Sequence, residues 1–392
     1  MPKRLGTTGG SGSVGVGVIG CGTIAQSAHL PAIARLRDRV RLVAVADVRA
    51  EAAERAAATW GAEFATTDYR ALLDRPDVDV VVIATPEFLH AEQVAAAAAA
   101  GKHILCEKPM APSVEEADAM LAATRAAGVV FMVGHSRRFT PRYREAHAAI
   151  RRGEIGRVRF ARENERRSRA MYSGLALATG AWSPDGEKTW MQSPDYSLGA
   201  VMLNAIHEVD LLRWFVGDEV TSVYAESRAV APDTEVPDYI SIQLRFANGA
   251  LAATEVVTNL PPDYPYYHHL EVFGTEGVIR ADDARSTVYR ETAATGIAEP
   301  LSFATLLRVD TAYVDELRNV LDAVEFGAPL WVPPEEARQA VLLAVAAAWS
   351  ARRNAVAHIQ PDFYRIGNDN AGRMDDAEDT DVNTNPEGGE PR

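Results

Sequence analysis

Residues 14–30, VGVGVIGCGTIAQSAHL, decide the fold of this chain because they join a buried strand to a glycine turn and a helix start. Residues 14–19 are apolar or glycine, which is typical of a strand covered on both faces of a parallel sheet. The turn that follows has the pattern G-x-G-x-x-A, a loose form of the dinucleotide-binding fingerprint. Such a turn brings backbone N–H groups of a helix N-terminus close to a pyrophosphate. We therefore predict a dinucleotide site whose turn is formed by Gly20, Gly22, Thr23, Ile24 and Ala25.

The second predicted strand ends at an acidic residue with the spacing of a ribose ligand. Residues 41–46, RLVAVA, are mostly apolar, and Asp47 follows them directly. A carboxylate there accepts hydrogen bonds from ribose hydroxyls and repels a 2′-phosphate, so NAD is the expected cofactor. Arg49 lies close enough in sequence for NADP to stay open as a second cofactor. The alternative is an ordinary strand–helix turn in which Asp47 caps the following helix.

Composition limits the classes of protein to consider. The 392 residues are enough for two domains, and the net charge of −14 argues against nucleic acid and anionic membranes as partners. No apolar run reaches the roughly 18 residues of a transmembrane helix. The two cysteines, Cys21 and Cys106, suit the reducing cytoplasm, and we expect both to be small buried hydrophobes.

The pattern of predicted secondary structure changes after the first third of the chain. Strands alternate with helices up to about residue 140, which predicts a doubly wound parallel sheet. Beyond Gly156, polar and apolar residues alternate along short strands, which indicates an open, mostly antiparallel sheet. Helices are expected within this part at 198–215, 312–326 and 334–353. The predicted organisation is a flexible leader (1–13), a Rossmann domain (14–140), an α+β domain (141–365) and a disordered acidic tail (366–392).

Polar residues follow two of the buried strands directly. Thr85 and Pro86 come after residues 78–84, and Glu107, Lys108 and a proline come after residues 102–106. Ligands of an open parallel sheet bind beyond the carboxyl ends of its strands, so these residues are expected at the cofactor crevice. Lys108 is then aimed at the crevice; the alternative is an ordinary surface lysine.

A second stretch with candidate catalytic residues is LGAVMLNAIHEVDLLRW, residues 198–214. On a helix, Leu203 and His207 share one face, and Asp210 is a neighbour of His207 at i, i+3. A histidine is suited to exchange a proton with a substrate hydroxyl near neutral pH. The alternative is a core histidine whose hydrogen bond is satisfied by Asp210.

Six segments together resemble the Gfo/Idh/MocA oxidoreductase family over residues 14–359. They are GCGTIA, VVIATPEFLHAEQV, GKHILCEKPMA, GHSRRFTPRY, the H-x-x-D of His207 and Asp210, and FGTEGVI. The E-K-P triplet is the family's most specific mark. The resemblance implies a Rossmann domain, an α/β domain whose open sheet often joins subunits into dimers or tetramers, and activity on sugars, inositols and related polyols with NAD or NADP.

The resemblance also implies roles for individual residues. His207 takes the proton-transfer position, and Lys108 polarises the substrate oxygen. The residues expected along the nicotinamide and its ribose are Thr85, Pro86, His90, Glu107 and, as the aromatic partner, Trp190. We expect no metal site, because His268 and His269 are adjacent and point to opposite faces of a strand.

One position departs from the family pattern. Many members carry Asp four residues before the histidine, and here that residue is Leu203. Leucine cannot orient the imidazole or raise its basicity, so three functions stay open. They are a sugar or polyol oxidoreductase, an NAD-dependent glycoside hydrolase on the same fold, and a non-catalytic NAD-sensing regulatory protein.

Overall fold

The computed structural model describes residues 13–168, 191, 199, 201–230, 235–261, 263–282, 286–290, 294–297 and 309–360. Almost all of the predicted leader, Trp190 and the whole predicted tail lie outside these residues. Within the described chain, no helix combines the length and apolar character needed to cross a membrane.

The amino-terminal sheet has six parallel strands in the order β3-β2-β1-β4-β5-β6. This is the strand order of a Rossmann fold, and it confirms the predicted doubly wound sheet. The short β3 was not predicted, because three half-buried residues give no periodic signal. The strands are β1 (Val14–Ile19), β2 (Val40–Ala46), β3 (Phe64–Thr66), β4 (Val80–Ile83), β5 (His103–Glu107) and β6 (Phe131–Gly134).

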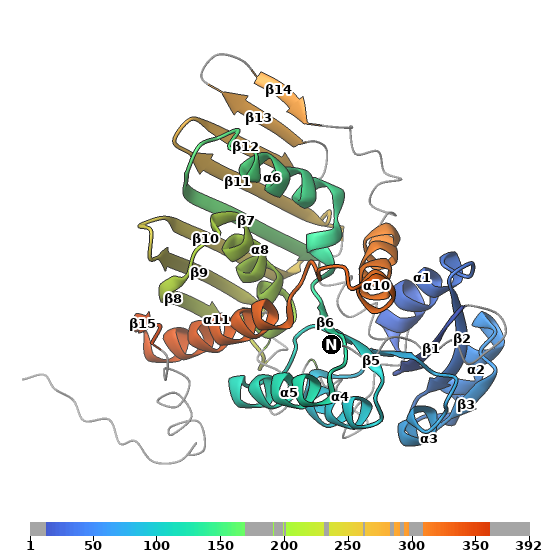
Figure 1. The fold of residues 1–392 in the computed structure, drawn as a ribbon. Helices are drawn as coiled ribbons and strands as arrows, with labels where there is room; N and C mark the ends of the chain where they lie inside the picture. Colours follow the sequence, from blue (N-terminus) through green and yellow to red (C-terminus); the bar gives the residue numbers. More distant parts are fainter. Residues whose placement is uncertain are drawn as a thin grey trace, which may run out of the picture.

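Helices cover both faces of this sheet. In Figure 1, α4 (His90–Ala99) and α5 (Val114–Ala127) lie together on one side, whereas α1 (Leu30–Arg35) and α10 (Val309–Phe326) lie on the other. Because α10 contacts β5 and β6, a late part of the chain completes the core of the first sheet. The remaining short elements of this region are η1 (Ala25–His29), α2 (Ala50–Trp60), α3 (Tyr69–Leu73), η2 (Glu87–Leu89) and η3 (Ser136–Phe139).

The second sheet is open and has the strand order β14-β13-β12-β11-β7-β10-β9-β8-β15. Its described pairs are antiparallel except for β7 with β10, so the mostly antiparallel sheet was predicted correctly and this parallel pair was not. The strands β13, β14 and β15 were also missed. Bounds are β7 (Val158–Ser168), β8 (Val220–Arg228), β9 (Tyr239–Phe246), β10 (Leu251–Leu260), β11 (Tyr267–Gly274), β12 (Gly277–Asp282), β13 (Ser286–Arg290), β14 (Ala294–Ile297) and β15 (Ala357–His358).

Helices pack on one face of the second sheet. They are α6 (Pro141–Arg151), α8 (Ile206–Val216) and α11 (Pro334–Arg353), drawn in green to red in Figure 1. On β9, buried residues alternate with residues that are partly or fully exposed, so the two faces of the sheet differ in polarity.

The helix expected at 198–215 has two different parts. A π-helical turn, η5 (Val201–Ala205), precedes the α-helix, which begins only at Ile206. Leu203 and His207 therefore lie on either side of the junction between the π-helical turn and the α-helix.

Candidate active site

A cavity of about 540 Å³ lies beyond the carboxyl ends of β1, β2, β4 and β5. Ligands of an open parallel sheet bind at this edge, at the point between β1 and β4 where the strand order reverses. The cavity brings together most of the residues predicted for cofactor and substrate, and these are Gly20, Gly22, Thr23, Ile24, Asp47, Thr85, Pro86, Glu107 and Lys108.

The glycine turn has the shape that a phosphate-binding turn requires. Gly20 has a φ of +91°, and a Cβ built there lies only 2.5 Å from the carbonyl oxygen of Ala84. A Cβ on Gly22, in contrast, meets nothing within 4 Å, so the backbone there borders open space in the cavity. Ala25 is fully buried and does not line the cavity; it packs η1 against the core. The turn therefore fits a dinucleotide pyrophosphate.

Asp47 connects the glycine turn to the end of β2. Its Oδ2 accepts a hydrogen bond of 2.9 Å from the backbone N–H of Cys21, and its Oδ1 accepts one of 3.0 Å from the N–H of Arg49. The alternative that Asp47 caps the next helix is wrong, because the N-cap of α2 is Arg49. The carboxylate is thus fixed at the edge of the cavity where the sequence predicted the adenosine ribose.

His90 lies behind the cavity wall. Its two ring nitrogens each lie 2.9 Å from a backbone carbonyl, that of Pro109 and that of Thr85. The ring is fully buried, and burial lowers the pKa of His90. His90 does not line the cavity; it joins the loops after β4 and β5, which carry lining residues.

Glu107 is held by a buried histidine from the first helix. His29 Nε2 lies 2.8 Å from Glu107 Oε1, and the backbone N–H of Lys108 donates to Oε2 at 3.1 Å. Burial raises the pKa of Glu107, but the hydrogen bond and charge of His29, together with the charge of Lys108, outweigh it and hold the pKa below its usual value. An ionised Glu107 therefore stands at the base of the cavity.

Lys108 extends from the end of β5 toward the second sheet. Its Nζ donates a hydrogen bond of 2.8 Å to the carbonyl oxygen of Leu203 in η5. Burial lowers the pKa of Lys108, and the nearby charges of Arg167 and Arg137 lower it further. The alternative of an ordinary surface lysine is wrong, because the side chain lines the cavity and is half-buried.

His207 lies on the first turn of α8 and is 6 % exposed. Burial, followed by the charges of Arg137 and Lys108, lowers its pKa well below the usual value, so the imidazole is neutral near pH 7. The alternative of a core histidine bonded to Asp210 is wrong: the two described side chains share no hydrogen bond, and the Asp210 carboxylate accepts from Arg138 at 2.7 and 2.6 Å. Nδ1 of His207 has no partner among the described residues.

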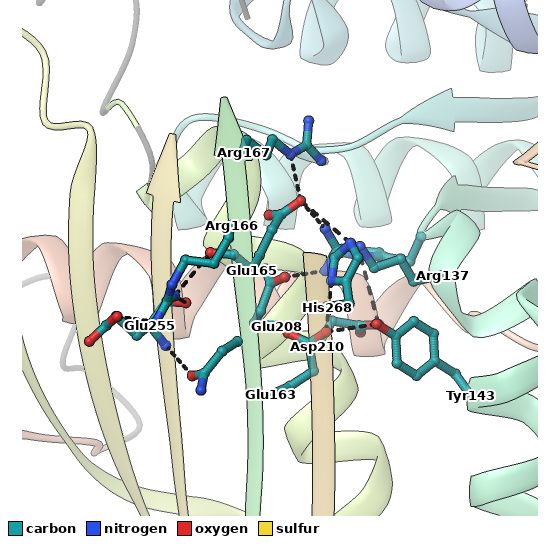
Figure 2. Close-up of polar contacts among 12 residues, drawn as sticks. Arg137, Tyr143, Glu163, Glu165, Arg166, Arg167, Glu208, Asp210, Glu255 and His268 are labelled. Carbon is teal, nitrogen blue, oxygen red and sulfur yellow. Dashed lines mark hydrogen bonds and ion pairs between the residues drawn. The ribbon is translucent and has the colours of Figure 1, made fainter. Parts of the chain in front are cut away.

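Sequence reasoning missed a buried polar cluster beside His207 (Figure 2). Its members project from β7, β11, α8 and the segments before β7, and they are Arg137, Tyr143, Glu163, Glu165, Glu208 and His268. Arg137 contacts Glu208 and lies 2.9 Å from Glu165, and His268 lies 2.9 Å from Glu163. The one local signal for this cluster is that Glu163 and Glu165, two positions apart on β7, point to the same face of the strand. Their partners are remote in sequence, so the signal could not identify them.

Three members of the cluster stand close enough to share an ion. Ligand atoms of Glu163, Glu208 and His268 lie within 4.8 Å of one another. Both ring nitrogens of His268 are already engaged, with Glu163 at 2.9 Å and with the hydroxyl of Tyr266 at 2.5 Å. The guanidinium of Arg137 also lies against Glu208. These contacts favour a hydrogen-bonded cluster over a cation site, because a cation would have to displace them.

Two family models match the chain, one over the first sheet and one over most of the second. Residues 14–135 match "Oxidoreductase family, NAD-binding Rossmann fold", and residues 143–280 match "GFO/IDH/MocA C-terminal domain". The chain belongs to the Gfo/Idh/MocA oxidoreductase family. The predicted family, its two-part fold and its NAD-binding oxidoreductase class are thereby confirmed.

Individual relatives of this Gfo/Idh/MocA protein carry names of polyol and sugar enzymes. Myo-inositol 2-dehydrogenase of Thermotoga maritima is 30% identical over 85% of this chain and 94% of its own. Inositol 2-dehydrogenase of Rhizobium meliloti is 30% identical over 86% of this chain and 96% of its own. Among solved structures, levoglucosan dehydrogenase in complex with NADH superposes with a TM-score of 0.77 at 27% identity, covering 89% of this chain and 99% of that one.

Proposed function

We propose that this protein uses NAD to interconvert a secondary hydroxyl and a carbonyl on a sugar, an inositol or a related polyol. The observation that carries the proposal is the position of Lys108, whose ammonium lies in the predicted cofactor cavity and is bonded to the turn that precedes His207. The names of the inositol and levoglucosan dehydrogenases among its relatives support the same substrate class.

Lys108 stabilises charge and His207 transfers the proton in the proposed reaction. NAD, when bound, supplies the hydride acceptor, and its predicted ligands are the glycine turn, Asp47 and the residues around Thr85 and Glu107. Lys108 donates to the substrate oxygen and stabilises the negative charge that develops on it. His207 is neutral near pH 7 and accepts the hydroxyl proton in the oxidative direction, then returns it in the reductive direction.

Leu203 takes part through its main chain. Its side chain carries no acid to assist His207, but its carbonyl oxygen accepts the hydrogen bond from Lys108. The hydrogen bond holds the ammonium against the π-helical turn, and the proposal puts the substrate oxygen beside it. Position 203 therefore holds Lys108 through its main chain, while the acid that assists the histidine in many family members is absent.

The deciding experiment mixes purified protein with NAD, and separately with NADP, against sugars and cyclitols while the near-ultraviolet absorbance of reduced nicotinamide is followed. Nitrophenyl glycosides are tested in parallel. Net reduction of NAD with a polyol supports the proposal. Glycoside cleavage without net reduction would instead assign an NAD-dependent hydrolase, and NAD binding with neither activity would assign a regulatory protein.

We further propose that the protein is a cytoplasmic homodimer or homotetramer joined through the open sheet. On β9 the residues between the buried positions, such as Ser241, Gln243 and Arg245, are partly or fully exposed, and they provide the polar surface for such an interface. Light scattering of the purified protein tests this: a monomer at micromolar concentration contradicts the proposed assembly.

A further inference from the structure

One guanidinium enters the cavity from the second sheet. Arg167 lies near the end of β7 and lines the cavity together with Lys108 and Asn204. Glu165, to which Arg167 bonds, also lies 2.9 Å from Arg137, and Arg137 contacts Glu208, the neighbour of His207 in sequence. Arg167 therefore stands at the catalytic end of the cavity rather than at the predicted adenosine end.

The polar cluster holds this guanidinium in place without using all its donors. Nε of Arg167 donates to Glu165 Oε1 at 2.5 Å, and one Nη donates to the hydroxyl of Tyr266 at 3.2 Å (Figure 2 shows the bond to Glu165). The guanidinium also lies over the Tyr266 ring, 5.0 Å from its centre. A guanidinium has about five N–H donors, so these two bonds, counted among the described residues, leave about three for a ligand in the cavity.

The charge of Arg167 is only partly compensated. Oε1 of Glu165 is shared with Arg137, which lies 2.9 Å away, so one carboxylate faces two guanidinium groups. Burial raises the pKa of Glu163 well above its usual value and that of Glu208 to about 7, so neither is a full negative charge at neutral pH. Lys108 also lines this end of the cavity beside the ionised Glu107, so Arg167 is the cation there that shares its carboxylate with a second guanidinium.

We propose that Arg167 binds an anionic group, a carboxylate or a phosphate ester, on the sugar or polyol that reacts beside Lys108. The inference rests on the proposed function and narrows its substrate class. A planar guanidinium with free donors binds such a group by charge-assisted hydrogen bonds, which are stronger than bonds to neutral hydroxyls. The anionic group holds one end of the substrate while the reacting hydroxyl faces Lys108.

The test compares sugars that differ at one carbon. D-glucose, D-glucuronate and D-glucose 6-phosphate form one set, and D-galactose, D-galacturonate and D-galactose 6-phosphate form the second. Affinity for the protein loaded with NADH is read from the nicotinamide fluorescence, and kcat/KM is measured wherever NAD is reduced. We expect an anionic member to bind about 10- to 100-fold more tightly than its neutral partner, in line with hydrogen bonds between charged groups. The preferred member distinguishes carboxylate from phosphate.

Arg167→Met keeps the length of the side chain and leaves Glu165 paired with Arg137, so the fold is preserved. It should abolish the difference in affinity between the anionic and the neutral members while NADH affinity remains. Arg167→Lys should retain part of the preference. Arg166→Met is the matched control, since Arg166 points to the other face of β7 and bonds to Glu255.

Two results would overturn the inference. One is the absence of any preference for an anionic member in both sets, and the other is an equal loss of neutral and anionic binding in Arg167→Met. The proposed function fails separately: anionic binding without NAD reduction by any polyol would remove the oxidoreductase activity but keep Arg167 as an anion ligand. Reduction of NAD by neutral polyols alone would keep the oxidoreductase activity but remove Arg167 as an anion ligand.

Discussion

The ammonium of Lys108 donates a hydrogen bond of 2.8 Å to the carbonyl oxygen of Leu203, and this bond joins the end of β5 to the turn before α8. The side chain at position 203 is the one departure from the family pattern that the sequence analysis found. The contact shows that position 203 still holds a cavity residue, Lys108, because any residue there supplies a main-chain carbonyl. The site is thus assembled from both sheets, and its predicted roles can be tested one residue at a time.

Lys108→Met should lower kcat/KM for the reacting polyol by at least about 10²-fold, within the range of a polarising and proton-transfer group. NADH affinity should stay close to that of the unchanged protein. Lys102→Met is the control, since Lys102 is a buried lysine that bonds to the carbonyls of Arg75 and Val78, away from the cavity. Unchanged turnover in Lys108→Met would remove this residue from the mechanism.

The oxidative reaction should stay active at unusually low pH. Only neutral His207 accepts a proton, and its pKa is lowered by burial and by Arg137 and Lys108, so the neutral form persists below the ordinary histidine value. The acid limb of kcat/KM against pH is therefore expected below about 6.5. His207→Asn should lose roughly 10²- to 10⁴-fold in rate and the limb with it. An acid limb at or above the ordinary histidine value would assign the proton to another group.

Asp47→Ala should weaken the preference for NADH over NADPH. The carboxylate is fixed by the backbone N–H of Cys21, and its removal takes away both the predicted ribose acceptor and the repulsion of a 2′-phosphate. Fluorescence titration with each reduced cofactor measures the ratio without a substrate. Asp77→Ala, at the amino end of β4, is the control and should leave the ratio unchanged. If Asp47→Ala keeps the original ratio, the ribose is recognised elsewhere.

Arg138→Met should destabilise the fold by about 3–5 kcal/mol, because it leaves the buried carboxylate of Asp210 without its cation. Arg138 and Asp210 are each 2 % exposed and share two hydrogen bonds. Arg70→Met, which breaks an exposed pair with Glu92, should change the stability far less, because solvent screens that pair. Urea unfolding of both variants measures the difference, and equal costs would contradict the assigned role of the buried pair.

Glu316→Gln should stabilise the protein at alkaline pH. Both carboxylate oxygens of Glu316 are buried without a partner in the described chain, and burial raises its pKa well above the usual value. The protonated form thus stabilises the folded state, and this contribution declines as the pH rises through the raised pKa. The advantage of Glu316→Gln in thermal unfolding should therefore grow from pH 4 toward pH 9. An advantage independent of pH would contradict this assignment.

Much of the cofactor side could be predicted because it is local in sequence. Gly20, Gly22, Asp47, Thr85 and Lys108 each follow a buried strand, and the carboxyl ends of parallel strands meet at one edge. Their convergence on the cavity needs only the strand order. Their exact roles toward NAD remain predictions, and Trp190 lies outside the described residues.

The partners of buried charges could not be predicted, because they come from elements far apart in the chain. Asp210 is a neighbour of His207 in sequence, yet the tertiary fold pairs it with Arg138. The polar cluster likewise joins residues separated by up to 131 positions, from Arg137 to His268. The spacing of residues along one helix or strand does not show whether a buried charge pairs with a neighbour in sequence or with a residue from a distant element.

The sequence by itself determined the Rossmann domain, the open second sheet and the residues at the strand ends, because apolar periodicity and glycine turns act over a few positions. Only the tertiary structure decided the parallel pairing of β7 with β10, the π-helical turn at Leu203 and the entry of Arg167 into the cavity. Each of these depends on packing two separate sheets against shared helices. The free energy of that packing is a property of the whole fold, and no short segment encodes it.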